Sequence, residues 1–358
     1  MKTFLKIFIG LILLLALIIG GYVAYVFIDF YRLDDMLELE VQNVSDEAAC
    51  LDTEYLIVCY NVGFGAYSND YSFFMDGGKY SRAFSREAVY ENLDGAFSVV
   101  KKENPDFIYL QEIDVGSTRS YHVDQYVLAM EAFPDYGSVF AQNYDSPYLF
   151  YPFIRPHGKS VAGLVTLSSF KIEEAVRRSL PIEDSFMKLV DLDRCYSLIR
   201  VPTENGKSLC LYNLHLSAYS SDGSIATRQL EMLFEDMSSE YAAGNYILCG
   251  GDFNKDLLGD SSKIFGVSGE EYSWAQSFPF ELLPKNFSLI APLDERNPIP
   301  SARNANAAYD PETAFVLTID GYIVSDNVEV ISSAVIDEGF AYSDHNPVKM
   351  YFSLKSDM

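Results

Sequence analysis

The sequence predicts one large α/β domain behind a single N-terminal membrane-spanning helix. Between Tyr55 and Leu354, short apolar runs of β-rich composition recur, and helical stretches lie between several of them. A run of 22 residues without a charge, Ile7–Ile28, precedes this region. Hydrophobic residues make up 49 % of the 358 residues and aromatic residues 15 %, which is enough to bury a sizeable core. Intrinsic disorder is therefore excluded for most of the chain.

The first expected element is the membrane helix. As an α-helix, Ile7–Ile28 would span about 33 Å, which matches a hydrocarbon core of about 30 Å. A cleaved signal peptide is the alternative, but its apolar region is normally about 7–15 residues long, and no clear small-residue cleavage site follows. Lys2 and Lys6 precede the run, and mainly acidic residues follow it. The positive-inside rule then predicts a single-pass signal anchor over residues 1–28, with a cytoplasmic N-terminus and an exported remainder.

Two further regions follow the anchor. Residues 29–53 are acidic and lack a long apolar run, so a juxtamembrane stalk is expected there, and residues 54–358 are expected to form one domain. Helices are predicted over Arg86–Lys101 and Thr227–Met237, where apolar residues recur at helical spacing. The predicted strands are Tyr55–Tyr60, Phe107–Leu110, Ser160–Leu167, Ser208–Leu216, Tyr246–Cys249, Phe315–Ile319 and Val348–Leu354.

The charge balance restricts the possible functions. With 51 Asp and Glu against 26 Lys and Arg, the chain has a formal net charge of −25. A general nucleic-acid coating protein needs Lys and Arg to neutralise phosphates, so this class is disfavoured. An enzyme that brings divalent cations to an anionic substrate fits better. Five cysteines are too few for a disulfide scaffold, and the sequence contains neither a G-x-S-x-G elbow nor an H-E-x-x-H motif.

Polar residues stand at the ends of the predicted strands. In layered α/β folds ligands bind where strands end, so these side chains are expected to converge. Each residue alone is better explained by a turn or a helix cap, and the loop residues His122 and His157 suggest no partner. The complete ordered set is better explained by a functional site. It comprises Asn61, Gln111-Glu112, His215, Gly250-Gly251-Asp252-Phe253-Asn254, Asp320 and Ser343-Asp344-His345.

This order of motifs resembles the endonuclease/exonuclease/phosphatase superfamily, the DNase I-like proteins. The resemblance covers about residues 55–356, and its most specific pieces are NPDFIYLQE, GGDFN and YSDHNPV. It implies a four-layer αββα sandwich for the domain. It also implies a metal-dependent hydrolase that cleaves phosphoester bonds by in-line attack of water, without a covalent intermediate.

The resemblance also implies a metal site. Glu112 would hold Mg²⁺ with help from Asn61 and Asp344, and Mn²⁺ is a possible substitute. Hard divalent cations prefer carboxylate and amide oxygens, which these side chains supply.

The catalytic roles follow from the same resemblance. Asp252 and Asn254 would position the attacking water and contact the phosphate, while His345, paired with Asp320, would bind the phosphoryl oxygens. A carboxylate beside His345 raises the pKa of the imidazole and favours the cation. His215 resembles the second histidine of the nuclease, toxin-nuclease and sphingomyelinase branches. Either Asp252 or a histidine could take the proton of the water.

Two arginines are further candidates for phosphate contact. Arg303 lies just upstream of Asp320, where a structural role is equally consistent with the sequence. Arg228 lies on the predicted helix after His215, where a solvent-facing salt bridge is an alternative.

Three functions remain open. The first is a membrane-anchored phosphodiesterase or phosphatase that acts on a lipid head group or another small phosphoester. The second is an ectonuclease, for which a basic groove would have to assemble from Arg119, Arg155, Lys159 and Arg303, so that nucleic acid is expected only as a substrate. The third is an inactive binding module. The expected partners are a phosphoester and the membrane, and the sequence indicates no protein partner.

Overall fold

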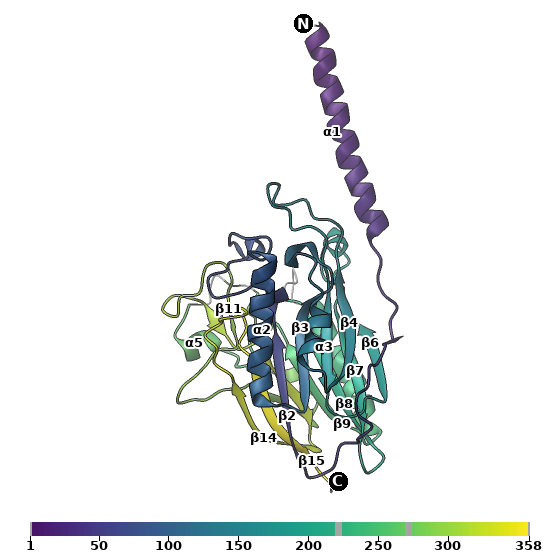
Figure 1. Cartoon of the computed structure of the whole chain (residues 1–358), viewed down its shortest axis with the longest axis vertical. Coiled ribbons are helices and arrows are strands. Elements are labelled where there is room, and N and C mark those ends of the chain that lie inside the picture. The colour runs from purple at the N-terminus through teal and green to yellow at the C-terminus, as the bar shows by residue number, and fades with distance from the viewer. Residues whose placement is uncertain (1, 219–223, 269–271, 273, 357–358) are drawn as a thin grey trace.

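A computed structural model describes residues 2–218, 224–268, 272 and 274–356. Helix α1 (Lys2–Asp29) extends away from a compact domain that the rest of the chain forms (Figure 1). Its mean hydropathy and its length make it a candidate membrane span. The domain helices are α2 (Arg86–Glu103), α3 (Gln125–Ala132), α4 (Ser224–Ala242) and α5 (Ser261–Phe265). Short 3₁₀ turns cover Gly63–Gly65, Phe74–Asp76, Thr118–Ser120, Phe186–Leu189 and Phe280–Leu282.

Two large sheets form the centre of the domain. The seven-stranded sheet contains, in spatial order, β1 (Leu37–Glu38), β6 (Glu174–Ser179), β7 (Cys195–Pro202), β8 (Ser208–His215), β9 (Tyr246–Asp252), β13 (Asp320–Ser325) and β10 (Phe287–Ile290). The six-stranded sheet contains β14 (Val328–Val335), β15 (Val348–Leu354), β2 (Glu54–Asn61), β3 (Phe107–Asp114), β5 (Val161–Ser168) and β4 (Gly137–Asp145). A small separate ladder pairs β11 (Ala302–Arg303) with β12 (Val316–Leu317).

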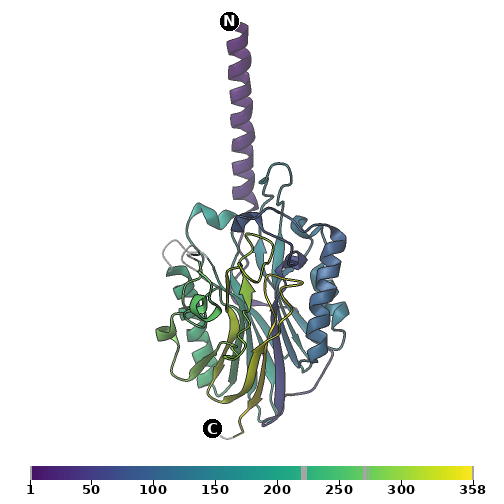
Figure 2. The same cartoon turned by 90° about the vertical axis from the view of Figure 1, so that its left-hand side faces the viewer.

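The sheets and helices stack in four layers (Figure 2). The middle core lies between the sheets, where Ile57 and Tyr109 of one sheet are in the same cluster as Leu211 and Leu248 of the other. A second core joins the six-stranded sheet to α2 and α3, and a third joins the seven-stranded sheet to α4. This arrangement confirms the predicted αββα sandwich.

Helix α2 illustrates how local sequence produces these layers. Ser85 caps its N-terminus by accepting a hydrogen bond from the backbone N–H of Ala88 at 3.1 Å. Asn104 ends the helix in the left-handed conformation, which asparagine tolerates well. Between the caps, apolar residues at helical spacing, such as Val89 and Leu93, are buried against the sheet.

The predicted strand Phe315–Ile319 is shorter than expected. Only Val316–Leu317 form β12, and Asp320 begins β13 instead of following a strand. Between the two strands, the backbone bonds to serine side chains instead of to a neighbouring strand. The N–H of Thr318 donates to Ser261 Oγ at 3.2 Å, and the N–H of Ile319 donates to Ser301 Oγ at 3.0 Å. These bonds take the place of a sheet ladder and turn the chain into the site.

The acidic segment 29–53 packs along the domain and does not stand away from it as a free stalk would. Leu37–Glu38 adds the edge strand β1 beside β6, and Ala49 is fully buried in the middle core. The segment therefore contributes a strand and a core residue to the domain.

Candidate active site

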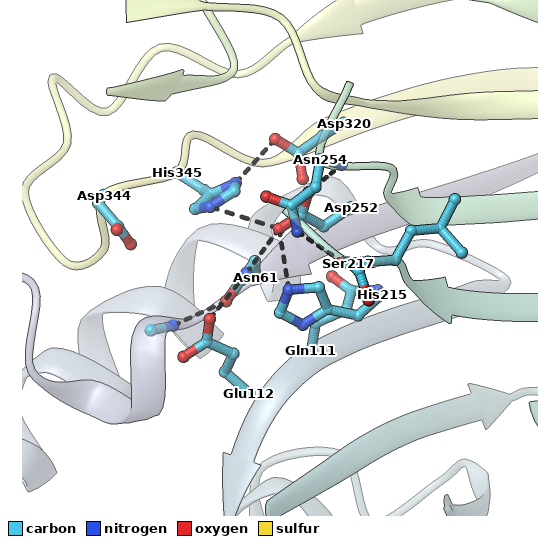
Figure 3. Close-up of polar contacts among 12 residues, drawn as sticks. Asn61, Gln111, Glu112, His215, Ser217, Asp252, Asn254, Asp320, Asp344 and His345 are labelled. Atoms are coloured by element: carbon cyan, nitrogen blue, oxygen red, sulfur yellow. Dashed lines mark hydrogen bonds and ion pairs between the residues drawn. The ribbon is translucent and has the colours of Figure 1, made fainter. Parts of the chain in front are cut away.

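A cavity of about 400 Å³ lies where the two sheets present their polar strand ends. Strand β3 brings Glu112 to its lining from the six-stranded sheet, and β8 and β9 bring His215 and Asp252 from the other. Asn61 of β2 and Asp320 of β13 lie beside Asp252, behind the lining. The loop before β15 adds Asp344 and His345. The expected convergence of these eight residues, including Asn254, is visible in Figure 3.

Asp252 lies at the centre of the cluster. Its Oδ2 accepts a hydrogen bond from Asn61 Nδ2 at 3.1 Å and lies 3.4 Å from His215 Nε2 and 3.7 Å from His345 Nε2. Its Oδ1 accepts the backbone N–H of Asn254 at 2.9 Å. Burial raises the pKa of Asp252 to about 7, and the nearby charge of His345 opposes that rise. Both oxygens are thus held in a fixed orientation.

His345 and Asp320 form a buried ion pair. The Nδ1–H of His345 donates to Asp320 Oδ2 at 2.8 Å, and Ser301 Oγ donates to the same oxygen at 2.7 Å. Burial alone would lower the pKa of His345, but the carboxylate of Asp320 outweighs it and raises the pKa to about 10. His345 is therefore an imidazolium at neutral pH, and its Nε2–H points to Asp252 (Figure 3).

His215 is in the opposite state. Burial lowers its pKa well below the usual value, and the positive charges of Arg194 and His345 lower it further. The Nδ1 atom is buried and has no hydrogen-bond partner within the described part of the chain. His215 is thus a neutral imidazole beside Asp252, while His345 beside the same carboxylate is charged.

The β8–β9 pair brings these groups together through a close backbone contact. Gly251 has φ +144°, and a Cβ placed there would lie 2.0 Å from the carbonyl oxygen of Leu214. Only glycine fits this approach, which places Asp252 opposite His215 in the parallel register. Across the other neighbour, Asp252 is the register partner of Asp320.

A bulge in β3 directs Glu112 into the cavity. The register with β5 shifts between Leu110 and Ile113, and Glu112 has φ +58°. Its Oε1 accepts a hydrogen bond from Asn61 Nδ2 at 3.4 Å. Gln111 points the other way and donates to Asn213 Oδ1 at 2.7 Å in the buried middle layer, so it is a structural residue.

Two half-buried carboxylates, those of Glu112 and Asp344, line the cavity. Withdrawal from bulk water raises the pKa of both groups. The only hydrogen bonds to them within the described residues come from Asn61 and Ser343, and neither carboxylate forms a salt bridge there. A divalent cation would balance this charge with the hard oxygen ligands that it prefers, so these residues fit Mg²⁺ or Mn²⁺.

A second acidic group is less suited to a metal. Ligand atoms of Asp252, Asp320 and His345 lie within 4.8 Å of one another. However, His345 is protonated and its Nδ1–H already donates to Asp320, so the ring has no free lone pair. The positive charge that this cluster needs is the imidazolium itself.

The structure places the two arginine candidates in different sites. Arg303 is buried, lines the cavity described above and donates to the carbonyl oxygens of Asn304, Ala307 and Ser68, with its Nε unpaired among the described residues. Arg228 lines another pocket, together with Lys255. Its contact with phosphate remains a prediction that this placement does not support.

The sequence reasoning did not identify Arg194. This buried side chain lines the same cavity, donates to the backbone oxygen of His215 at 3.2 Å and forms no salt bridge within the described residues. It is the residue before β7, a strand that the sequence pattern did not predict. Had a strand been predicted over Cys195–Pro202, Arg194 would have been recognised as a polar residue at a strand end, like the other site residues.

A family model described as "Endonuclease/Exonuclease/phosphatase family" matches residues 58–345. The chain belongs to this family, and the resemblance seen in its motifs is confirmed. None of the curated protein sequences matches the chain significantly.

Solved structures share the fold at low sequence identity. An endonuclease/exonuclease/phosphatase from Beutenbergia cavernae DSM 12333 is 15 % identical with a TM-score of 0.55, and the match covers 84 % of this chain and 72 % of that one. ANGEL2, a 2',3'-cyclic phosphatase in complex with adenosine-2',3'-vanadate, is 15 % identical with a TM-score of 0.56 over 89 % and 99 % of the two chains. D. rerio TDP2, complexed with a single-strand DNA product, is 16 % identical with a TM-score of 0.52 over 84 % and 100 %.

Proposed function

We propose that this protein is a membrane-anchored, divalent-metal-dependent hydrolase of phosphoester bonds. The observation that carries the proposal is the charge arrangement around Asp252. A charged His345 and a neutral His215 face one carboxylate, beside two further carboxylates that lack a cation partner among the described residues. This arrangement suits a substrate that brings negative charge and a reaction that needs both a cationic group and a proton acceptor.

Glu112, Asp344 and Asn61 would hold Mg²⁺, and Mn²⁺ could replace it. When bound, the ion would supply Lewis-acid stabilisation of charge on the phosphoryl group. His345, held by Asp320, donates its Nε2–H to a phosphoryl oxygen and stabilises the charge that develops there.

Asp252 orients the attacking water and accepts its proton. Hydrogen bonds from Asn61 and from the backbone of Asn254 fix the carboxylate, and a pKa of about 7 is well matched to proton transfer at neutral pH. Asn254 donates its side-chain amide to the Leu216 carbonyl at 2.8 Å, so its Oδ1 is left to the water or the substrate. His215 keeps Asp252 in place from the other side.

The proposed substrate is a lipid head group or another small phosphoester. The formal net charge of −25 disfavours a nucleic-acid substrate, and the apolar helix α1 supports a membrane location. We further propose that the N-terminus is cytoplasmic and that the domain is exported, because Lys2 and Lys6 precede the apolar run.

An ectonuclease is the second candidate, favoured by His215 and by the complete motif order. All four cations expected in a basic groove already have partners on the protein, since Arg303 donates to backbone carbonyl oxygens as described above. Arg119 pairs with Asp114 at 2.8 Å, Lys159 pairs with Asp145 at 3.1 Å, and Arg155 donates to the carbonyl oxygens of Ala83 and Phe84. These contacts favour the small phosphoester.

The deciding experiment compares plasmid nicking with release of phosphate products from soluble phosphoesters and phospholipid vesicles. The purified full chain in detergent is assayed with Mg²⁺, and His345→Ala and EDTA are the controls. Hydrolysis of small phosphoesters that both controls abolish, without nicking, would support the proposal. Nicking that both controls abolish would establish the nuclease instead. A folded, Mg²⁺-binding protein that is inactive on every substrate would support the binding module.

A further inference from the structure

We propose that residues 149–154 insert into the same membrane that α1 spans, and that this insertion presents the catalytic cavity to phosphoester head groups at the membrane surface. The insertion depends only on the anchoring by α1, whereas its catalytic consequence rests on the proposed function. The binding partner is thus the lipid bilayer itself.

The loop has an unusual number of exposed apolar side chains. Phe153 is 84 % exposed and Ile154 is fully exposed, and Phe150 and Tyr151 beside them are more than half exposed. Large apolar side chains gathered in one loop are unfavourable in water and typical of a surface that binds a partner or a membrane. In both views the loop rises from the domain past the level of the lower end of α1 (Figures 1 and 2).

Direct contacts fix the loop against α1. Tyr22 Oη donates to the carbonyl oxygen of Tyr148 at 3.0 Å, and the backbone N–H of Tyr148 donates to Tyr25 Oη at 2.9 Å. The ring of Tyr22 also packs edge-on against Phe150, with the centroids 5.3 Å apart. At the end of the helix, Asp29 lies 3.6 Å from Lys159, which follows the loop.

These contacts set the depth of the loop. Tyr22 precedes Ile28, the end of the charge-free run, by six residues, which corresponds to about 9 Å along a helix. The base of the loop therefore contacts α1 inside the apolar run when α1 spans a bilayer. Tyrosines are the side chains that favour the interface between lipid and water, so Tyr22 and Tyr25 fit that depth.

A second apolar contact with α1 comes from the segment before Val190. Phe186 is 80 % exposed, and its ring packs edge-on against Phe27 of α1 at 6.3 Å. The chain that follows Phe186 supplies Val190 and Leu192 to the lining of the catalytic cavity.

The loop is also joined to the catalytic cavity. Tyr151 lies against Phe74, with ring centroids 5.9 Å apart, and His157 lies against both Phe73 and Phe74. Phe73, His157 and the exposed Met75 line the cavity itself. Two apolar segments that contact α1 thus adjoin the lining of the cavity, and in the proposed arrangement the cavity would open toward the membrane surface.

Fluorescence measures the insertion directly. The full chain with Trp274→Phe, which removes the only tryptophan, is reconstituted in phosphatidylcholine vesicles and carries either Phe153→Trp or Ile331→Trp. Ile331 is the matched control because it is an exposed apolar residue, 48 % accessible, on β14 at the far side of the domain (Figure 1). We expect blue-shifted emission and quenching by brominated phosphatidylcholine for Phe153→Trp alone.

Two results would overturn the proposal. One is water-like emission without quenching at both positions. The other is a blue shift without lipid quenching, which would indicate contact with a second copy of the chain.

Activity tests the catalytic consequence. The double variant Phe153→Ser, Ile154→Ser is expected to hydrolyse phospholipids in vesicles at least tenfold more slowly, while its hydrolysis of bis-p-nitrophenyl phosphate stays unchanged. The control Ile331→Ser is expected to hydrolyse both substrates at the wild-type rate. An equal loss on both substrates, or no loss on vesicles, would overturn the link between loop and cavity. If no variant hydrolyses anything, the proposed function fails, yet the fluorescence result still decides the insertion.

Discussion

At the scale of single residues, the site separates two histidines by charge. His345 is held as a cation by Asp320, whereas His215 is kept neutral by burial and by the nearby positive charges, although both approach Asp252. In the proposed mechanism, the charged imidazole donates to the substrate anion, whereas the neutral one leaves Asp252 free to act as a base. The charge of each histidine thus follows its surroundings: Nδ1 of His345 meets a carboxylate, whereas Nδ1 of His215 is buried without a partner among the described residues.

Glu112 should govern metal affinity. Glu112→Gln removes one negative charge from the ligands, so Mg²⁺ affinity should fall by about tenfold or more, as measured by calorimetric titration at fixed pH. Glu131→Gln removes the same charge from the exposed face of α3 and should leave the affinity unchanged. Equal affinities in the two variants would place the metal elsewhere.

His157 should make the protein sensitive to acid. Burial lowers its pKa to about 4, against 6.5 for the unfolded chain. Between these values the unfolded chain binds a proton that the folded chain does not, so the free energy of unfolding should decrease by about 3 kcal/mol as the pH falls from 6.5 to 4.

His157→Gln should flatten this part of the pH dependence, as measured by chemical denaturation at a series of pH values. His122→Gln, at an exposed loop position, serves as the control and should keep the wild-type slope. An unchanged slope in His157→Gln would contradict the assignment.

At the scale of elements, small irregularities in the strands orient the side chains of the site. The bulge in β3 turns Glu112 into the cavity and Gln111 into the core, and Gly251 lets β9 approach β8. A regular strand would place alternate residues on opposite faces without this adjustment.

Gly251→Ala should therefore be strongly destabilising. Its Cβ would meet the backbone of Leu214, which cannot move without breaking the β8–β9 ladder, so we expect a loss of about 3 kcal/mol or more in the free energy of unfolding. Gly206 also has a positive φ, of +78°, but it has open space around it, so Gly206→Ala should cost about 1 kcal/mol. Chemical denaturation of both variants gives the difference, and similar losses would mean that the backbone contact is not limiting.

The elements also show how far sequence reasoning reaches. The buried strands β2, β3, β8, β9 and β15 were predicted because they are continuous apolar runs, and the polar residues at their ends converge as expected. Strand β6 was not predicted, because Arg177 and Arg178 interrupt its apolar pattern. Arg177 is nevertheless fully buried, and it donates to Gln142 and Asp193. The bulge at Glu112 was also invisible, since it depends on pairing with a distant strand.

At the scale of the whole molecule, the acidic domain and the apolar helix have opposite solvent preferences. The sequence predicted both regions, but it could not predict that Tyr148 and Phe150 contact α1, because these contacts join segments more than 120 residues apart.

The proposed orientation can be tested with the native cysteines. Cys50 is exposed, whereas Cys59, Cys195, Cys210 and Cys249 are buried. A membrane-impermeant maleimide added to intact cells should label the chain, and Cys50→Ser should abolish the labelling. Labelling only after the membrane is permeabilised would show that the domain faces the cytoplasm.

The short connection between α1 and β1 has a consequence for kinetics. Helix α1 ends at Asp29 and β1 begins at Leu37, so only residues 30–36 join them. Even fully extended, these seven residues reach about 25 Å. If α1 anchors the domain as proposed, the domain would sample a thin layer above one leaflet, and its encounter rate with a lipid would depend on lateral diffusion in two dimensions. Its turnover of a lipid substrate would then follow the mole fraction of that lipid in the leaflet rather than its bulk concentration.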